Sequence, residues 1–406
     1  MKILFFTENT HRGGMDRVMI NLINHWPDPQ DELVLACNAE HPGLVDMEGQ
    51  ISRPVVMIRH TAFAYRRIIT LTERSPILSF FRKLLSPIFK YLCFFISIFT
   101  LGRLIKKIGP DRVMIIMGGY PGGDTCRAAA IACRLWLKGH KPVLSVHNDA
   151  TRSRWFEALQ EMCIDLLVAG SMSRIVTVSH ACAASFKWRG LLIHKRPVDV
   201  VYNGIPDMAA EALDSLDGGA LMLPSGAQIC LMLGTYELRK GHRFLIEVFK
   251  RVAAKITGVH LVICGYGKEH EVAGVKKMVS ESGLSQRIHL SGFKSNVAAL
   301  IAKAHVLVIP SQSHESFGLT AVEAMALRVP VVATNVGGIP EVVADGAGGF
   351  CFAPDDVSGF AEAVINFLTD EKLRREQGGL GYQRYQALFT ASKMAERYYA
   401  LVCNNG

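Results

Sequence analysis

The segment His305–Thr334, HVLVIPSQSHESFGLTAVEAMALRVPVVAT, decides the fold class of this chain. Its two ends, HVLVIP and PVVAT, are short apolar runs rich in valine, which is typical of strands buried on both faces. Between them, LTAVEAMAL has the composition of a buried helix. Buried strands joined by a helix predict a parallel sheet that is covered by helices on both faces.

The same alternation of short apolar runs and longer helical segments extends along the whole chain. The predicted strands of the first half are KILFFT, LVLAC, PVVMI, VMIIM, VLSVH, IVTVS and VDVVYN. Those of the second half are ICLML, VHLVICG, RIHLSG, HVLVIP, PVVAT and GFCFAP. Two such sets predict an α/β protein with two doubly wound, Rossmann-like domains. We expect them to face a central cleft, with a ligand at the carboxyl ends of the strands.

The domain boundary is predicted from composition. At 406 residues the chain is long enough for more than one domain. Its middle is rich in Gly, Pro, Asp and Ala and contains no predicted strand. We therefore place the first domain at 1–205, a linker at 206–228 and the second domain at 229–385. A C-terminal helix at 386–406 is expected to pack back on the first domain.

The bulk composition excludes some classes of protein. Half of the residues are hydrophobic and a fifth are charged, which is typical of a folded chain. The ten cysteines are scattered without a CxxC pair, which favours a reduced protein of the cytosol. The apolar run in the N-terminal MKILFFTENT is too short for a signal peptide. We therefore expect a cytoplasmic location.

Positive charge is concentrated in one segment of the first half. Residues 1–205 contain 26 Lys and Arg against 16 Asp and Glu, whereas the remainder is nearly balanced. Within 53–112 there are twelve cations and two acids. The uninterrupted apolar run here, Tyr91–Leu101, is about half of the ~20 residues that a membrane span requires. A basic, aromatic-rich helix over 77–107 instead predicts contact with an anionic membrane surface.

Two alternatives for this segment stay open, namely a buried core helix and a true membrane span. Nucleic-acid binding is disfavoured, because the cations lie among aliphatic and Phe residues rather than polar ones.

Two glycine-containing turns follow predicted strands and open helices. Gly13 and Gly14 follow the first strand, and Arg239 and Lys240 precede a glycine in the first turn of the second domain. Glycines let a backbone approach a phosphate, and helix N-termini attract anions. Purely structural turns and solvated loop cations are the alternatives.

Two carboxylates mark the turn and helix of the opening segment. If the backbone were helical throughout, Glu315 and Glu323 would lie about 12 Å apart, roughly the span from a sugar through a diphosphate to a ribose. Between them, the N–H groups of Phe317, Gly318 and Leu319 lie at the expected helix start, where an anion is favoured. A helix-terminal acid would also explain Glu315. A solvated position fits Glu323 poorly, because its neighbours are apolar.

One histidine and one absent motif complete the candidate site. His147 ends the strand VLSVH, where it would face the cleft, although a histidine satisfied within the core is the alternative. The chain contains no DxD motif, so a metal-bridged diphosphate has no support in the sequence. Protein cations and helix dipoles would then neutralise a diphosphate.

On these motifs the chain resembles the retaining GT-B glycosyltransferases of family 4. The resemblance covers nearly the whole chain and is strongest from Ile229 to Val343. Its most specific element is the E-x7-E motif ESFGLTAVE, followed by AMALRVPVVATNVGGIPEVV. The stretches VTVSHACAASF and VVYNGI match two further signatures.

The resemblance assigns roles to the second-domain residues. It implies that Glu323 binds the ribose of a nucleotide sugar, that Glu315 contacts the donor sugar, and that the backbone of Phe317–Leu319 contacts phosphate. Lys240 would hold the diphosphate. Glu315 and Lys240 are therefore candidate catalytic residues.

The resemblance extends to the first domain, with one departure in the second. Gly13 and Gly14 match the family's glycine pair and would bind the donor, and His147 matches its cleft histidine, a third candidate catalytic residue. Where the family has Gly-Arg, this chain has Thr235 after the glycine. We hypothesise that Arg239 replaces the missing donor-binding cation.

The resemblance also implies a reaction. A UDP- or GDP-sugar would donate its sugar, with retention of configuration, to a glycan or lipid-linked acceptor bound by the first domain. No cofactor and no metal are expected. The leaving diphosphate would accept the acceptor's proton in a front-face substitution. The implied process is cell-surface polysaccharide or lipopolysaccharide biosynthesis, at the cytoplasmic face of the inner membrane.

Three other functions remain as alternatives. A nucleotide-sugar epimerase would need neither an acceptor nor the basic apolar segment. Thr235 makes a catalytically silent sugar-nucleotide-binding subunit conceivable. An NAD-dependent enzyme is disfavoured, because the turn Gly265–Gly267 has His270 where the fingerprint requires a third glycine.

Overall fold

The computed structural model describes residues 1–9, 13–61, 76–137, 140–155, 157–214, 223–294 and 297–403, with the backbone alone at 76–89, 211, 213 and 214. The chain forms two compact units, Met1–Tyr202 with Ala391–Gly406, and Asn203–Thr390. The second unit thus begins at Asn203, ahead of the predicted linker.

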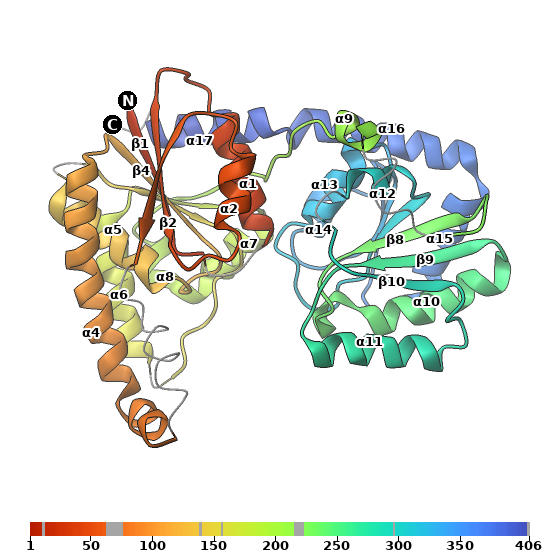
Figure 1. The fold of residues 1–406 in the computed structure, drawn as a ribbon, viewed down its shortest axis with the longest axis horizontal. Helices are drawn as coiled ribbons and strands as arrows, with labels where there is room; N and C mark the ends of the chain where they lie inside the picture. The colour runs from red at the N-terminus through yellow and green to blue at the C-terminus, as the bar shows by residue number, and fades with distance from the viewer. Residues whose placement is uncertain are drawn as a thin grey trace. The chain divides into compact units, whose positions relative to one another are not determined.

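The first unit is built on a seven-stranded parallel sheet with the strand order β3-β2-β1-β4-β5-β6-β7 (Figure 1). Its strands are β1 (Lys2–Thr7), β2 (Glu32–Asn38), β3 (Val55–His60), β4 (Arg112–Met117), β5 (Val143–Val146), β6 (Arg174–Thr177) and β7 (Val198–Val200). Its helices are α1 (Gly14–Asn24), α2 (Leu44–Gln50), α4 (Pro76–Ile108), α5 (Asp124–Trp136), α6 (Ala158–Ser171), α7 (His180–Ser185), η1 (Phe186–Arg189), α8 (Gly190–Ile193) and α17 (Ala391–Cys403).

The second unit is built on a six-stranded parallel sheet with the order β10-β9-β8-β11-β12-β13. Its strands are β8 (Gln228–Leu233), β9 (Val259–Cys264), β10 (Ile288–Ser291), β11 (Val306–Ile309), β12 (Val331–Thr334) and β13 (Gly349–Phe352). Its helices are α9 (Ala209–Asp214), η2 (Leu238–Lys240), α10 (His242–Lys255), α11 (Glu269–Glu281), α12 (Ala298–Ala302), α13 (Leu319–Ala326), α14 (Ile339–Val342), α15 (Val357–Thr369) and α16 (Glu371–Leu388). The predicted fold class and every predicted strand are confirmed.

The apolar runs form these strands because both faces of each sheet are covered. All six residues of β9 are buried, and β5, β11 and β12 are buried throughout. Aromatic side chains of the covering helices close the core of the second unit, where Phe244 on α10 meets Phe360 on α15 edge to face at 5.3 Å. Burial of this apolar surface is the main stabilising term of each unit.

The strand order fixes where a ligand site can lie. In the first sheet the direction of winding reverses between β1 and β4, and in the second sheet between β8 and β11. At such a switch point the two following loops diverge and leave a crevice at the carboxyl ends of the strands. Each unit therefore has one preferred edge position for binding.

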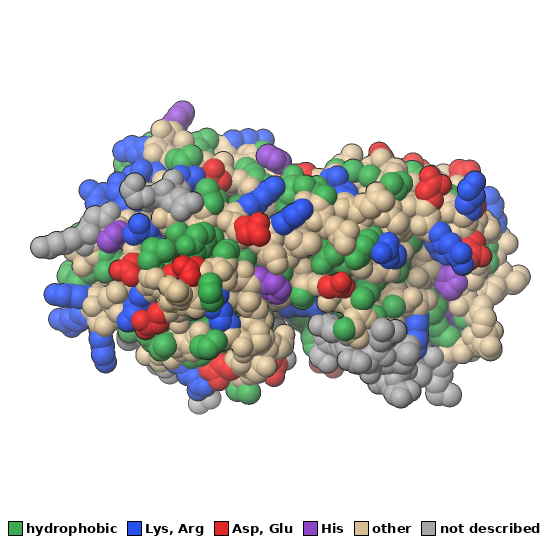
Figure 2. Space-filling model, turned by 90° about the horizontal axis from the view of Figure 1, so that it is seen from above, with side chains coloured by type: hydrophobic (Ala, Val, Ile, Leu, Met, Phe, Trp, Pro, Cys, Tyr) green, Lys and Arg blue, Asp and Glu red, His purple; other side chains and the backbone are tan. Residues whose placement is uncertain are grey.

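The cationic character of the first half is visible at the surface. Blue Lys and Arg side chains gather on the left of Figure 2, over the first unit. Within the described part of the chain, no helix has the length and apolar character needed to cross a membrane.

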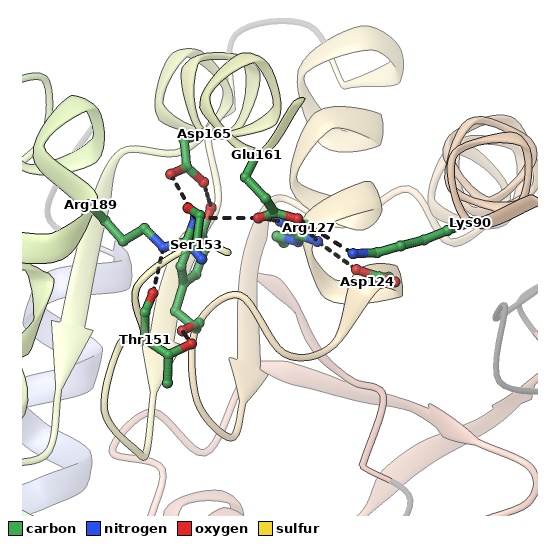
Figure 3. Close-up of polar contacts among 9 residues, drawn as sticks. Lys90, Asp124, Arg127, Thr151, Ser153, Glu161, Asp165 and Arg189 are labelled. Carbon is green, nitrogen blue, oxygen red and sulfur yellow. Dashed lines mark hydrogen bonds and ion pairs between the residues drawn. The ribbon is translucent and has the colours of Figure 1, made fainter. Parts of the chain in front are cut away.

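A buried ion network ties four elements of the first unit together. Figure 3 shows Lys90 of α4, Arg127 of α5 and Arg189 of η1 converging on Glu161 of α6. Arg127 Nη1 lies 2.8 Å from Glu161 Oε2, and Arg189 Nη1 also lies 3.3 Å from Asp165 Oδ2. The network includes Asp124 and Tyr120 as well, so three cations balance three carboxylates. Such a network is stable only while every charge keeps a partner.

Glu161 is the residue that this network depends on most. Burial by itself would raise its pKa, but Arg127, Lys90 and Arg189 lower it below the ordinary value. A carboxyl group whose pKa falls on folding stabilises the native state at neutral pH. That contribution is lost as the pH falls through the folded-state pKa.

We predict that Glu161→Gln lowers the free energy of unfolding by about 3–5 kcal/mol at pH 7, because it leaves two buried guanidinium groups short of an anion. The matched control, Glu281→Gln, removes a carboxylate that pairs with Lys277 at 3.8 Å on the exposed face of α11. It should change the free energy by less than about 0.5 kcal/mol. Urea unfolding of both variants measures the difference, and equal effects would contradict the assigned role.

Candidate functional site

An ion pair joins the two loops at the switch point of the second sheet. Lys240 ends η2 after β8, and its Nζ donates to Glu315 Oε2 in the loop after β11, at 2.5 Å. The hydroxyl of Ser311 donates to the same oxygen at 3.1 Å. Both side chains of the pair are only 16% exposed. Lys240 is therefore not a solvated loop cation, and that alternative is wrong.

Arg239 lies beside this pair and is held by its own carboxylate. Its Nε donates to Glu237 Oε2 at 2.6 Å, and its Nη1 lies 4.0 Å from Glu315 Oε2. Thr235 donates to the other oxygen of Glu237 at 2.9 Å. Partial burial would raise the pKa of Glu237, but the hydrogen bonds from Arg239 and Thr235 lower it. Thr235 thus helps to orient the neighbouring cation.

Two glycines allow the loops of the site to approach each other. At Gly241 φ is +78°, and a Cβ atom would lie 1.8 Å from the carbonyl oxygen of Pro310. At Gly337 φ is +58°, and a Cβ atom would lie 2.1 Å from the carbonyl oxygen of Glu315. Side chains are excluded at both positions by conformation and by space. These glycines therefore fix the backbone on which Lys240 and Glu315 stand.

Two helices begin directly after the loops of the site, and neither has a side-chain cap. Gly241 is the N-cap of α10 and Gly318 is the N-cap of α13. By contrast, Asp356 and Asp370 cap α15 and α16 with their carboxylates. A helix N-terminus without a side-chain cap, beside two cations, is a favourable position for a phosphate group.

Glu323 lies one turn inside α13 and is only 2% exposed. The solvated alternative for this residue is therefore wrong. Phe317 is also buried, and its ring meets Phe389 edge to face at 5.8 Å. Because α13 begins only at Leu319, the separation of about 12 Å that we estimated for a helix throughout does not apply to Glu315.

The first-unit candidates lie at the carboxyl edge of their own sheet. His147 directly follows β5, and its Nε2 lies 3.0 Å from Ser145 Oγ. Ser145 in turn lies 2.8 Å from the hydroxyl of Tyr398 on α17. Part of the His147 residue is exposed, but loss of water around its ring lowers the pKa to about 4. The imidazole is therefore neutral at pH 7.

Gly13 and Gly14 open α1, as predicted. Gly13 has extended backbone, and among the described residues no atom lies within 4 Å of where a Cβ would lie. Its N–H donates to Asp16 Oδ2 at 3.1 Å. Neither a steric clash nor a positive φ requires glycine at position 13, which leaves close approach of a ligand as a reason for it.

The third glycine turn has a structural explanation. A Cβ atom at Gly265 would lie 1.8 Å from the carbonyl oxygen of Gly234, so glycine lets the loops after β8 and β9 touch. The next residue, Tyr266, is exposed and meets the exposed ring of Phe293 edge to face at 5.9 Å. This aromatic pair at the ends of β9 and β10 was not among the predicted site residues.

Sequence reasoning also missed Glu8, which follows β1. The backbone N–H of Thr125, at the start of α5, donates to Glu8 Oε2 at 2.8 Å. Burial raises the pKa of this carboxyl group, although the hydrogen bonds from Thr125 oppose the rise. Glu8 therefore bridges the two loops at the switch point of the first sheet. An acid directly after a buried strand, as in FFTEN, is the signal that would have found it.

Comparison with known proteins shows which family and which fold this chain resembles. Residues 220–384 match the family model of the glycosyl transferases group 1. The matched residues lie within the second unit, so this part of the chain is similar to that family.

Relatives with assigned activities align with parts of the chain. They include human alpha-1,3/1,6-mannosyltransferase ALG2, 29% identical over 59% of the chain. The lipopolysaccharide core biosynthesis glycosyltransferase LpsE of Rhizobium meliloti is 28% identical over 47%, and the D-inositol 3-phosphate glycosyltransferase of Mycolicibacterium paratuberculosis is 34% identical over 42%. The chain spans only 60%, 54% and 39% of the lengths of these three relatives.

Solved structures match over almost the whole chain. A glycosyltransferase from Rickettsia africae gives a TM-score of 0.74 at 16% identity, covering 100% of this chain and 99% of that one. Anabaena Alr3699/HepE, solved in complex with UDP, gives 0.71 at 18% identity, with 99% of each chain covered. At these identities the likeness shows the fold, which is GT-B.

We predict that Gly241→Ala lowers the free energy of unfolding by more than about 1 kcal/mol, because alanine is strained at positive φ and collides with Pro310. The control, Gly274→Ala, places a methyl group in open space on α11 and should stabilise that helix by up to about 1 kcal/mol. Thermal unfolding of both variants tests this. A Gly241→Ala variant as stable as its control would show that the loop contact is not required.

Proposed function

We propose that the chain is a retaining glycosyltransferase that moves a sugar from a nucleotide-sugar donor to a glycan or lipid-linked acceptor. The observation that carries the proposal is the Lys240–Glu315 pair at the switch point of the second sheet, beside the uncapped N-termini of α10 and α13. Cations and free N–H groups suit a diphosphate, and a carboxylate suits sugar hydroxyl groups.

The donor would lie along the crevice from one glutamate to the other. Lys240 and Arg239 would bind the diphosphate together with the backbone at Phe317–Leu319. Glu315 would accept hydrogen bonds from the sugar, and Glu323 from the ribose. The UDP bound in the HepE structure supports a UDP-sugar as one donor candidate, and a GDP-sugar is the other.

Lys240 and Glu315 neutralise each other in the structure. A diphosphate would attract Lys240 more strongly than one carboxylate does, since it carries more charge. Binding would thereby release Glu315 Oε2 to face the sugar. Donor binding and sugar positioning are coupled in this way through one hydrogen bond.

Catalysis would consist mainly of stabilising the leaving diphosphate. As the bond from the anomeric carbon to the phosphate oxygen breaks, Lys240, Arg239 and the helix N-termini stabilise the growing negative charge. The acceptor oxygen attacks from the same face, and its proton passes to the leaving phosphate. His147, being neutral at pH 7, would hydrogen-bond to the sugar rather than act as a cationic acid. Gly13 and Gly14 would let backbone approach the donor.

The proposal includes metal independence and an acceptor made at a membrane. The relative LpsE acts in lipopolysaccharide core biosynthesis, which supports a role in cell-surface polysaccharide or lipopolysaccharide assembly. We propose that the acceptor is carried on lipid at the cytoplasmic face of the inner membrane, where this chain would act as a peripheral protein.

Incubation of the purified chain with radiolabelled nucleotide sugars and a membrane lipid extract, in EDTA, tests the function. Transfer of label to the lipid-soluble fraction supports the proposal. Interconversion of donors indicates an epimerase, and binding without product indicates a silent subunit. Dependence on added metal would contradict the metal-independent part.

We predict separate effects for the two glutamates. Glu323→Ala should weaken nucleoside diphosphate binding about 10–100-fold, because the ribose loses a charged acceptor. Glu315→Ala should lower kcat about 100-fold while changing the Kd of the nucleotide much less. Calorimetry and initial rates measure both quantities, with exposed Glu281→Ala as the control. Unchanged binding and rates in both variants would refute the assignment.

We predict that Arg239→Ala raises the Kd of the donor about tenfold, because a charge-assisted contact to the diphosphate is lost. The control, Arg243→Ala, removes an exposed guanidinium group from the first turn of α10, close to Arg239 in the sequence. If Arg239→Ala bound and turned over the donor as the control does, Arg239 would not replace the missing family cation.

A further inference from the structure

One face of α4 is exposed although its side chains are apolar. Leu92, Phe95, Ile96 and Phe99 are 52%, 50%, 38% and 59% exposed. The opposite face is buried against the unit and consists of Cys93, Phe94, Ser97, Ile98, Leu101 and Ile105. In Figure 1 this long orange helix runs beside α5 and α6.

The exposed apolar residues share their face with cations. At about 100° per residue, an arc of about 120° on the helix holds all four apolar residues. The same arc holds Arg103, Lys106 and Lys107, which are also exposed. We call these seven residues the α4 face. It contains no acidic residue, and its apolar part lies within about 10 Å along the axis.

The α4 face is rigidly attached to the first unit. Phe99 meets Trp136 of α5 edge to face at 5.7 Å, and the Trp136 ring lies where a Cβ atom of Gly102 would be. Two residues before the face, Lys90 pairs with Glu161 at 3.5 Å (Figure 3). Two further cations of the predicted helix at 77–107, Arg82 and Lys83, have side chains outside the described residues. A helix fixed in this way presents its outer face without rearrangement.

We infer that the α4 face docks on the surface of an anionic lipid bilayer. Leu92, Phe95, Ile96 and Phe99 enter the boundary between headgroups and acyl chains, and the three cations contact anionic headgroups. The use of a lipid-linked acceptor at this surface rests on the proposed function. The docking of the α4 face on a bilayer does not itself require sugar transfer.

A second copy of this chain fits the α4 face less well. Two faces in parallel would bring three cations against three cations. In antiparallel orientation the cations of each helix would cover the apolar residues of the other. An anionic bilayer satisfies both parts of the face at once, because it offers negative charge next to an apolar interior.

Co-sedimentation with vesicles tests the apolar part of the face. We expect the chain to bind vesicles of phosphatidylglycerol and phosphatidylcholine, and to bind phosphatidylcholine alone weakly. The double variant Phe95→Ser/Phe99→Ser should bind the anionic vesicles at least about tenfold more weakly, because two rings no longer enter the interface. Because Phe99 also loses its ring contact with Trp136, a thermal unfolding curve first confirms that the variant is folded. Wild-type binding by this variant overturns the inference.

A charge variant and its matched control test the basic part. Arg103→Gln/Lys106→Gln/Lys107→Gln should weaken binding to anionic vesicles at least about tenfold. The control, Lys255→Gln/Lys276→Gln/Lys277→Gln, removes three exposed charges from α10 and α11 of the second unit. Equal losses in the two triple variants would show that net charge acts rather than this face, and would overturn the inference.

Two further readouts distinguish lipid docking from donor binding and from self-association. Nucleotide binding by the variants of the α4 face should equal that of the wild type, so the vesicle result does not depend on the proposed reaction. Sedimentation velocity without lipid should show the same oligomeric state for wild type and Phe95→Ser/Phe99→Ser. A change from oligomer to monomer would identify the face as a contact between copies and overturn the inference.

Discussion

The hydrogen bond from Lys240 to Glu315 is the contact on which the proposed site depends. It joins two loops whose strands, β8 and β11, are neighbours in the sheet although the residues lie 75 positions apart in the chain. The pair holds two opposite charges at a largely buried position, where each charge compensates the other. It also explains how a diphosphate would change the site, since taking Lys240 away leaves Glu315 ready for another donor of hydrogen bonds.

Glycines and side-chain hydrogen bonds determine where this pair can form. Gly241 and Gly337 bring the loops together, and Ser311 and Glu237 hold the charged groups at their ends. The first unit uses the same topology with different chemistry. There Glu8 bridges to the start of α5, and His147 is tied through Ser145 to α17. Both units therefore hold their polar groups at the carboxyl edge of a parallel sheet.

The strands of both sheets and the burial of one site residue could be predicted from the sequence, for physical reasons. Short apolar runs rich in valine and isoleucine, separated by helical segments, are typical of strands in a sheet covered on both faces, so all the strands could be predicted from them. Apolar neighbours likewise predicted the burial of Glu323. Contacts between distant loops could not be predicted, because they depend on strand order. These contacts include the pair of Lys240 with Glu315 and the hydrogen bond from Thr125 to Glu8. The hydrogen bond from Arg239 to Glu237 could not be predicted either, nor could the division of α4 into a buried and an exposed face.

We propose that the loops after β8 and β11 bind a diphosphate through protein groups alone. It is tested most directly by calorimetry of the wild-type chain in EDTA with UDP, GDP, uridine and guanosine. We predict that the preferred nucleoside diphosphate binds at least about 100-fold more tightly than its nucleoside, since most of the contacts are charge-assisted bonds to phosphate. Equal affinity of diphosphate and nucleoside would contradict it.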